Sequence, residues 1–284
     1  MTKSQSLLSK HAKSFNWAGF FLPKETFNKC SILYDFCRTI DDIADTDNDL
    51  YIRKKNLLKF RSDFRNKNYS NNIIKNIYLV LNKDNISYKI IDDLFDGIES
   101  DLKKKVEITT QKDLLIYSYR VAGTVGLMMA KILKVKDNYS LKCAIDLGIA
   151  MQLTNIARDV VEDKKKGRFY INHNFDSIKE TIDVAETFYD SAFLAIKSIP
   201  IISRFSIIVA RRVYKKIGNK ILKQKNLENY NNSGKIYISN FGKIVETFLS
   251  FYDLLKLFFI SSKVHLKHNE YKILNEEINI DDKI

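Results

Sequence analysis

The sequence has few of the residues that interrupt helices. Its 284 residues include two prolines, Pro23 and Pro200, and nine glycines that are scattered singly. No proline- or glycine-rich linker, low-complexity tract or fixed-period repeat divides the chain. It also lacks a glycine-rich phosphate loop, which excludes a P-loop or Rossmann nucleotide site.

Cysteine and long apolar runs are also scarce. The three cysteines, at positions 30, 37 and 143, form no C-x-x-C pair, which excludes a disulfide scaffold or a cysteine-zinc site and fits a reducing compartment. No apolar stretch of signal-peptide length opens the sequence. The most apolar late stretch, residues 244–264, carries Glu246, Asp253, Lys256 and Lys263, too many charges for a membrane span. We therefore expect a cytoplasmic protein.

Basic residues outnumber acidic ones, 47 to 34, which gives a net charge of +13. Such an excess suits nucleic acid, anionic lipid headgroups or a diphosphate substrate. The lysines are spread along the whole chain without a dominant basic tail, which favours solvated helix faces over a nucleic-acid-binding stripe. We predict no nucleic-acid partner, and keep a non-catalytic nucleic-acid-binding protein as the rival hypothesis.

Apolar residues recur at steps of three and four, as in Ile86, Ile90, Leu94 and Ile98. This spacing is typical of helices rather than strands. It predicts helices over 24–45, 50–66, 71–82, 86–102, 111–134, 138–165, 177–198, 201–225 and 239–262. We expect one all-α domain over residues 1–284, with a charged tail over 265–284 that frays.

The first acidic cluster lies in the segment YDFCRTIDDIAD. Asp41 and Asp45 are four residues apart, so they share one helix face, which Arg38 and Tyr34 extend. Like charges at this spacing destabilise an isolated helix by a few tenths of a kcal/mol. They also stand at the end of the predicted helix, where the dipole disfavours anions. A bound cation would offset both effects.

The second acidic cluster lies in QLTNIARDVVED. Asn155, Asp159 and Asp163 follow one another at four-residue steps, and Gln152 joins the start of this polar stripe. The other faces of this helix are apolar, which is typical of a buried helix. A buried polar stripe without a partner would cost several kcal/mol, so we expect it to line a cavity.

Either stripe alone would be a solvated acidic face. Two stripes, each with an adjacent arginine (Arg38 and Arg158), favour a metal site instead. Carboxylate and amide oxygens suit Mg²⁺, with Mn²⁺ also possible, and the absence of histidine from both stripes argues against zinc or a di-iron centre. The predicted metal ligands are Asp41, Asp45, Asn155, Asp159 and Asp163.

Five ordered segments then resemble one family. Tyr34–Asp45 and Met151–Tyr170 resemble the two aspartate-rich motifs of the squalene/phytoene synthase family, the head-to-head prenyl transferases. The three further matches are His11–Phe15, Tyr119–Gly126 and Ala210–Gly218. The resemblance spans about residues 7–245 and is stronger to bacterial phytoene synthases than to squalene synthases. Two positions depart from the family. Ile171-Asn172 replaces the usual Leu-Pro. Lys235 stands where arginine is common, which keeps the positive charge but loses the planar guanidinium that binds phosphate through two hydrogen bonds.

The resemblance implies a helical bundle of the isoprenoid synthase type with a central apolar cavity. It implies Mg²⁺-dependent condensation of two geranylgeranyl diphosphates, through prephytoene diphosphate, to phytoene in carotenoid biosynthesis. The implied catalytic residues are Asp41, Asp45, Asp159, Asp163, Tyr119 and Tyr214. The implied substrate-binding residues are His11, Lys13, Ser14, Tyr34, Arg38, Gln152, Asn155, Arg158, Arg168 and Lys235.

Several alternatives stay open. The C15 version would join two farnesyl diphosphates to presqualene diphosphate, dehydrosqualene or squalene, and a chain-elongating or cyclising isoprenoid enzyme could use the same stripes. No nicotinamide fingerprint occurs, so we expect no nicotinamide cofactor. Because substrate and product are lipids, we expect peripheral contact with an anionic membrane. Gly123 and Gly126, inside a predicted helix, fit either a kink, an approaching prenyl chain or a simple contact between helices.

Overall fold

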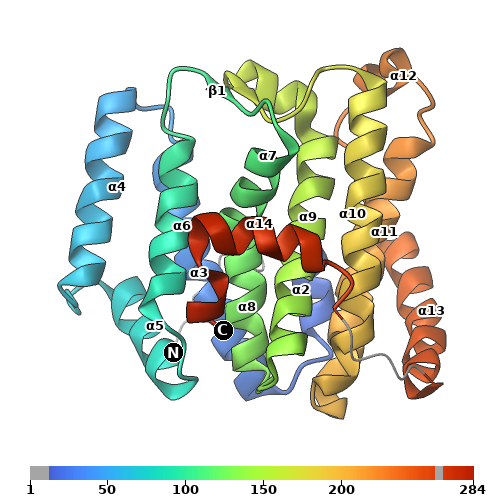
Figure 1. Cartoon of the computed structure of the whole chain (residues 1–284), viewed down its shortest axis with the longest axis horizontal. Coiled ribbons are helices and arrows are strands. Elements are labelled where there is room, and N and C mark those ends of the chain that lie inside the picture. Colours follow the sequence, from blue (N-terminus) through green and yellow to red (C-terminus); the bar gives the residue numbers. More distant parts are fainter. Residues whose placement is uncertain (1–12, 260–264) are drawn as a thin grey trace.

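The computed structural model describes residues 13–259 and 265–284, with side chains from residue 16 onward, and is built almost entirely of helices (Figure 1). The α-helices are α2 Lys13–Gly19, α3 Lys24–Asp45, α4 Leu50–Arg65, α5 Asn72–Lys83, α6 Tyr88–Ser100, α7 Gln111–Ser118, α8 Thr124–Ile132, α9 Asn138–Lys165, α10 Phe175–Ala195, α11 Ile201–Leu222, α12 Leu227–Asn232, α13 Asn240–Phe259 and α14 His268–Ile278. The short elements are the π-helix η1 Tyr119–Gly123, the 3-10 helices η2 Ile196–Ser198 and η3 Ile280–Asp282, and the strands β1 Val106–Glu107 and β2 Arg168–Phe169. The predicted all-α fold is confirmed.

Side-chain caps fix where several helices begin. The Asn71 side chain accepts from the backbone N–H of Ile73 and Ile74, and Asp137 accepts from Ser140 N at the start of α9. Each cap satisfies a backbone donor that the first helical turn leaves unpaired. The predicted starts agree with these caps to within a few residues.

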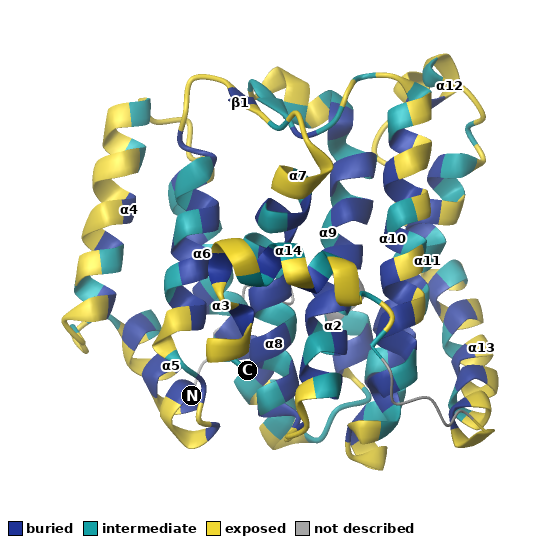
Figure 2. Cartoon of the chain, in the orientation of Figure 1, coloured by how far each residue is buried: buried dark blue, intermediate teal, exposed yellow. Residues whose placement is uncertain are grey.

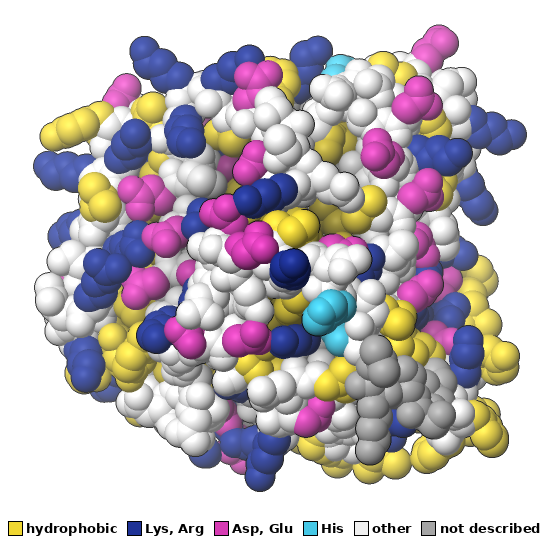
Figure 3. All heavy atoms as spheres, viewed as in Figure 1, with side chains coloured by type: hydrophobic (Ala, Val, Ile, Leu, Met, Phe, Trp, Pro, Cys, Tyr) yellow, Lys and Arg dark blue, Asp and Glu magenta, His cyan; other side chains and the backbone are white. Residues whose placement is uncertain are grey.

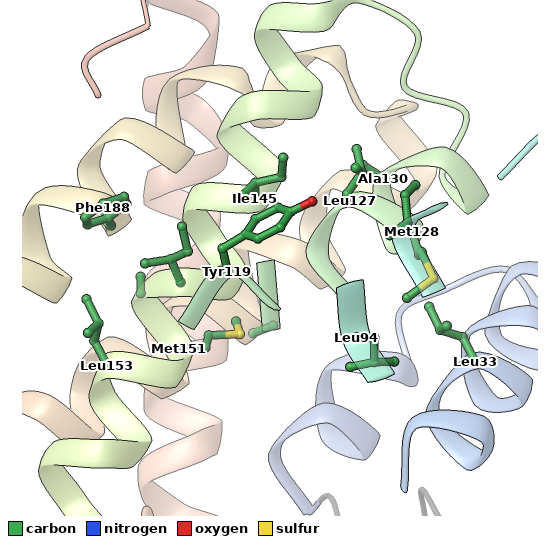
Figure 4. Packing of buried hydrophobic residues seen from close by; sticks show 14 of the residues in the cluster. Leu33, Leu94, Tyr119, Leu127, Met128, Ala130, Ile145, Met151, Leu153 and Phe188 are labelled. Carbon is green, nitrogen blue, oxygen red and sulfur yellow. The ribbon is translucent and has the colours of Figure 1, made fainter. Parts of the chain in front are cut away.

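The long helix α9 lies at the centre of the bundle, between α8, α10 and α11 (Figure 1). Half of its residues are buried, and they form much of the dark blue ribbon of α9 in Figure 2. The surrounding core holds the fully buried side chains of Phe36, Phe95 and Phe188. Tyr119 lies in the same core, among Ile145 and Leu127 (Figure 4). This packing leaves the polar stripe of α9 half-buried.

Two glycines allow α8 and α9 to approach each other closely. A Cβ on Gly126 would lie 2.2 Å from the carbonyl oxygen of Ala144, and a Cβ on Gly148 would lie 2.2 Å from that of Ala122. Real Cβ atoms do not approach backbone oxygens so closely. The glycines of this segment therefore serve contact between helices, one of the readings that the sequence left open.

The single helix predicted over 111–134 is interrupted. Residues Tyr119–Gly123 form a π-helical turn between α7 and α8. Single π turns are rare and have no signature in apolar spacing, which explains why the pattern did not reveal this one. The turn begins at Tyr119, whose hydroxyl donates to Asp93 Oδ2 at 2.9 Å.

The expectation of a fraying tail is wrong. Residues His268–Ile278 form α14, which crosses in front of α8 and α9 in Figure 1. Lys283 Nζ donates to Asp93 Oδ2 at 2.5 Å, and His265 Nε2 lies 2.7 Å from Asp146 Oδ2. Lys283 and His265 of the tail are thus partners of carboxyl groups buried on α6 and α9.

We expect Lys283→Met to lower the free energy of unfolding by about 2 kcal/mol, because the buried Asp93 carboxylate would lose its cationic partner. Urea denaturation followed by circular dichroism would measure the loss. Lys272→Met is the matched control, since this lysine of α14 is exposed. Equal midpoints for the two variants would contradict the assigned role of Lys283.

Candidate active site

The two acidic stripes end at a shared pair of basic residues. Asp45, the last residue of α3, accepts from Arg168 Nη2 at 2.7 Å and from Lys166 Nζ at 3.0 Å. Lys166 and Arg168 directly follow α9, which carries Asp159 and Asp163. The C-terminal ends of α3 and α9 therefore meet in space, although more than a hundred residues separate them.

A short parallel strand pair holds Arg168 in place. Val106 pairs with Arg168, and Glu107 pairs with Phe169. Gly167, which begins this turn, has a φ of +72°, a conformation that side chains with a Cβ rarely adopt. The pairing ties the segment after α9 to the loop after α6, so the Arg168 guanidinium lies against Asp45.

Two of the carboxyl groups are strongly perturbed. Burial raises the pKa of Asp41 to about 7, and the charges of Asp45 and Asp101 add to the rise against the opposing Arg38. Burial and the charge of Asp159 likewise raise the pKa of Asp163 to about 7. Both groups are surrounded by protein yet keep some contact with solvent. The site thus holds negative charge that a cation would stabilise.

Asp45 and Asp159 each accept hydrogen bonds from basic side chains. Burial opposes ionisation of Asp45, but Arg168 and Lys166 hold its pKa below the usual value. Asp159 receives two hydrogen bonds from Arg158, at 2.8 and 2.6 Å, and Lys235 Nζ lies 3.5 Å away. The pKa of Asp45 is therefore held low by its basic partners, and Asp159 lies between the basic side chains of Arg158 and Lys235.

The donor set fits Mg²⁺. Asn155 Oδ1 is buried and has no hydrogen-bond partner among the described residues. It stands one helical turn before Asp159, on the same face of α9. An amide oxygen without a partner, on the same helix face as two carboxyl groups, is the environment in which a hard cation replaces missing interactions.

The sequence did not reveal a further acidic residue of the site, Asp101. Its carboxylate accepts from the hydroxyls of Tyr117 and Tyr170 at 2.8 and 2.7 Å, and the two rings are stacked. Burial raises the pKa of Asp101, and its charge in turn raises those of Asp41 and Asp163. Asp101 lies in no aspartate-rich motif, so only Tyr170, at the end of the second segment, pointed towards it.

Aromatic and basic side chains surround the aspartates. Burial raises the pKa of Tyr34 to about 12, and the ionisable groups of Arg38, Tyr214 and Asp41 lie near enough to act on it. Burial also raises the pKa of Tyr214, which lies near Arg158. Tyr34, Tyr214, Arg158 and Asp41 therefore belong to one neighbourhood.

Three further residues that were predicted to bind substrate are Arg38, Lys235 and Gln152. Arg38 Nη2 is paired with Asp42 at 2.6 Å. Lys235 Nζ donates to Glu162 at 2.7 Å. Gln152 is half-buried at the start of the α9 stripe.

The structure does not bring every predicted residue to this site. The hydroxyl of Tyr119 faces Asp93 rather than the aspartates of α3 and α9, so its placement gives no support for a role at the reacting atoms. His11 lies outside the described residues, as do the side chains of Lys13 and Ser14.

Comparison with known proteins identifies the family. Residues 8–175 match the family model described as squalene/phytoene synthase. The chain is 29% identical to the 15-cis-phytoene synthase of Pantoea ananas over 243 residues, which cover 74% of this chain and 78% of that enzyme. It is 38% identical to the 15-cis-phytoene synthase of a Paracoccus strain over 149 residues, 46% of this chain and 49% of that enzyme.

Solved structures agree with this assignment. A crystal structure of a dehydrosqualene synthase in complex with a ligand superposes with a TM-score of 0.72 at 26% identity, over 88% of this chain and 95% of that one. A squalene synthase from Alicyclobacillus acidocaldarius, at 19% identity and a TM-score of 0.66 over 76% of this chain and 90% of that one, shares the fold. From its matching motifs, its helical fold and these relatives, the chain belongs to the squalene/phytoene synthase family.

Proposed function

We propose that this protein is a phytoene synthase, a prenyltransferase that condenses two geranylgeranyl diphosphates through prephytoene diphosphate to phytoene. The observation that carries the proposal is that Arg168 and Lys166, just after α9, bond Asp45 of α3 and also act electrostatically on Asp163 of α9. The relatives named 15-cis-phytoene synthase supply the reaction class.

The residues that would hold Mg²⁺ are Asp41, Asp45, Asn155, Asp159 and Asp163. A bound divalent cation supplies neutralisation of the charge that develops on the diphosphate leaving group. Arg158 and Arg168, now paired with Asp159 and Asp45, offer planar forks to diphosphate oxygens. Arg38 is paired with Asp42 and acts electrostatically on Asp41, and Lys235 lies 3.5 Å from Asp159, so both add positive charge beside the site.

Loss of diphosphate from the substrate would leave a carbocation, and the side chains around the site would protect it from water. Tyr34 and Tyr214 present aromatic rings, whose π faces stabilise positive charge. The apolar residues that cover the other faces of α9 exclude water, which would otherwise capture the cation. The polar residues of the α9 stripe are half-buried although the helix is central, which supports the predicted cavity beside the stripe.

The C15 reaction is the second candidate. The neighbour described as a dehydrosqualene synthase favours it, since it superposes over most of this chain. Both reactions use the same ionisation chemistry, and the depth of the apolar cavity separates them.

Product analysis tests the proposal. Purified protein with Mg²⁺, or Mn²⁺ in a parallel series, is incubated with either geranylgeranyl or farnesyl diphosphate, and the hydrocarbons are extracted. We expect a C40 product, and a C30 product without any C40 would contradict the phytoene assignment. Asp159→Asn should abolish turnover and keep the helical circular dichroism. Nucleic-acid binding with a steep salt dependence, and no Mg²⁺-dependent diphosphate release, would favour the non-catalytic rival.

We also propose that the enzyme works in the cytoplasm, peripherally attached to an anionic membrane. Within residues 13–259 and 265–284, no helix is both long and apolar enough to cross a bilayer. A substrate and a product that are lipids, together with a net charge of +13, support attachment from one side.

A further inference from the structure

The helix α13, Asn240–Phe259, has its polar side inward and its apolar side outward. Four of its five buried residues are polar or charged: Lys243, Glu246, Ser250 and Asp253. The exposed side carries Phe241, Ile244, Val245, Phe248, Leu249, Phe251, Tyr252, Leu255, Phe258 and Phe259. A surface helix of a water-soluble protein normally has the opposite arrangement.

Specific polar contacts fix this orientation. Arg212 of α11 bonds both Glu246, at 2.8 Å, and Asp253, at 2.9 Å, and Lys216 lies 3.2 Å from Glu246. The indole N–H of Trp17 donates to Thr247 Oγ1 at 3.0 Å. Rotating the helix to hide its apolar side would break these ion pairs, so the outward side stays available.

The apolar side continues onto neighbouring helices. The ring of Phe251 lies 4.6 Å from that of Phe205 on α11, one turn after the exposed Ile201 and Ile202. Phe205 in turn contacts Phe21, which follows the exposed Phe20. The outward residues of α13 with Ile201, Ile202 and Phe20 are called the α13 surface below. Figure 3 shows apolar side chains gathered over α13 at the lower right.

Basic residues lie beside the α13 surface. Within α13, which the structure describes in full, Lys256 is the single exposed charged side chain. A cleft of about 600 Å³ borders the helix, and five basic side chains, Arg211, Arg212, Lys215, Lys216 and Lys256, outnumber the three acidic ones that line it. The first four are ion-paired with acidic residues, and Lys256 is exposed. An apolar strip with a basic margin is typical of helices that lie in the headgroup region of anionic membranes.

We infer that the α13 surface inserts into one leaflet of an anionic bilayer, with α13 lying in the plane of the membrane. Its twenty residues give a helix of about 30 Å, so side chains at both ends of α13 can contact the membrane at the same time. The net charge of +13 favours an anionic bilayer over a second copy of the chain, which would carry the same charge. The inference names the surface for the peripheral attachment proposed above, and its test does not require catalysis.

Flotation with liposomes tests the inference. The full chain is mixed with vesicles of phosphatidylcholine alone or with added phosphatidylglycerol, and the floating fraction is measured. We expect binding to the anionic vesicles and at least a tenfold lower partition coefficient for Leu255→Glu/Phe258→Glu. The matched control is Leu58→Glu/Leu79→Glu on α4 and α5, on the opposite side of the molecule from α13 (Figure 1), where the original residues are similarly exposed.

Fluorescence provides a second measurement. Trp17 is the single tryptophan of the chain, so Trp17→Phe/Phe248→Trp places one reporter on the α13 surface. Brominated acyl chains should quench this reporter and leave a Trp17→Phe/Leu79→Trp reporter bright. Absence of flotation, equal losses in the two glutamate pairs, or a dimer in light scattering that the α13 pair abolishes would each overturn the inference.

Discussion

Asp41→Asn is expected to lower turnover by about a hundredfold to a thousandfold and, at the same time, to stabilise the metal-free protein. The carboxylate is a predicted Mg²⁺ ligand, and amide oxygen binds the cation less strongly. Burial and nearby carboxylates raise the pKa of Asp41 to about 7, so its charged form is unfavourable when no cation is present. The same group therefore supports catalysis and lowers the free energy of unfolding, as functional carboxylates often do.

The stability gain should depend on pH. A carboxyl group whose pKa is higher in the folded state favours folding below its ordinary pKa of 3.8, and this contribution is lost as the pH rises through about 7. Thermal denaturation without metal should show wild type losing stability between pH 5 and pH 8. The Asp41→Asn variant should lose less stability over this range, and at pH 8 its free energy of unfolding should exceed that of wild type by about 1–2 kcal/mol.

Asp47→Asn is the control for this measurement, because this aspartate is exposed just after α3. It should keep both turnover and the wild-type pH dependence. Added Mg²⁺ should stabilise wild type more at pH 8 than at pH 6, since ionised carboxylates bind the cation. An Asp41→Asn variant with wild-type turnover would remove Asp41 from the proposed metal site.

Gly148→Ala is expected to destabilise the protein by about 3 kcal/mol or more, or to prevent folding. Its new Cβ would lie 2.2 Å from the carbonyl oxygen of Ala122 and 2.9 Å from the Cα of Gly123. Both are backbone atoms in the centre of the bundle, so the only relief is separation of α9 from the π turn and α8. Urea denaturation would measure the loss.

Gly218→Ala on α11 is the matched control. This buried glycine also lies within a helix, but its added Cβ would meet the Ile182 side chain at 3.3 and 3.4 Å. A side chain can shift, and alanine favours a helix by about 1 kcal/mol over glycine. We therefore expect a change within about 1 kcal/mol. A smaller loss for Gly148→Ala than for Gly218→Ala would contradict the close-contact explanation.

Much of the fold followed from local patterns, because helices leave their signature within a few residues. The three- and four-residue spacing of apolar residues predicted most helices to within a few residues, and caps such as Asn71 and Asp137 fix their starts in the structure. The spacing could not reveal the π turn at Tyr119–Gly123 or the order in the tail. Both depend on contacts with distant residues: the tail is held by Asp93 and Asp146, far earlier in the chain.

The candidate site, like the fold, was predicted only in part from local patterns. The four-residue spacing put Asp41 with Asp45, and Asn155 with Asp159 and Asp163, onto single helix faces. The presence of two such stripes, each beside an arginine, favoured a metal site over a solvated acidic face. Asp101 was missed, because its link to the site passes through Tyr170 and a strand pair that no local pattern indicates.

The sequence by itself determined the helices, the two acidic stripes and the family, because each depends on residues that are close together in the chain. Tertiary structure alone decided that α3 and α9 end at the same basic pair, that Gly126 and Gly148 face backbone, and that α13 turns its apolar side outward. The physical reason is that the partner of a side chain, whether Arg168 for Asp45 or Arg212 for Glu246, is set by packing between segments far apart in sequence. Periodicity finds the faces of a helix, and only its neighbours decide which face is buried.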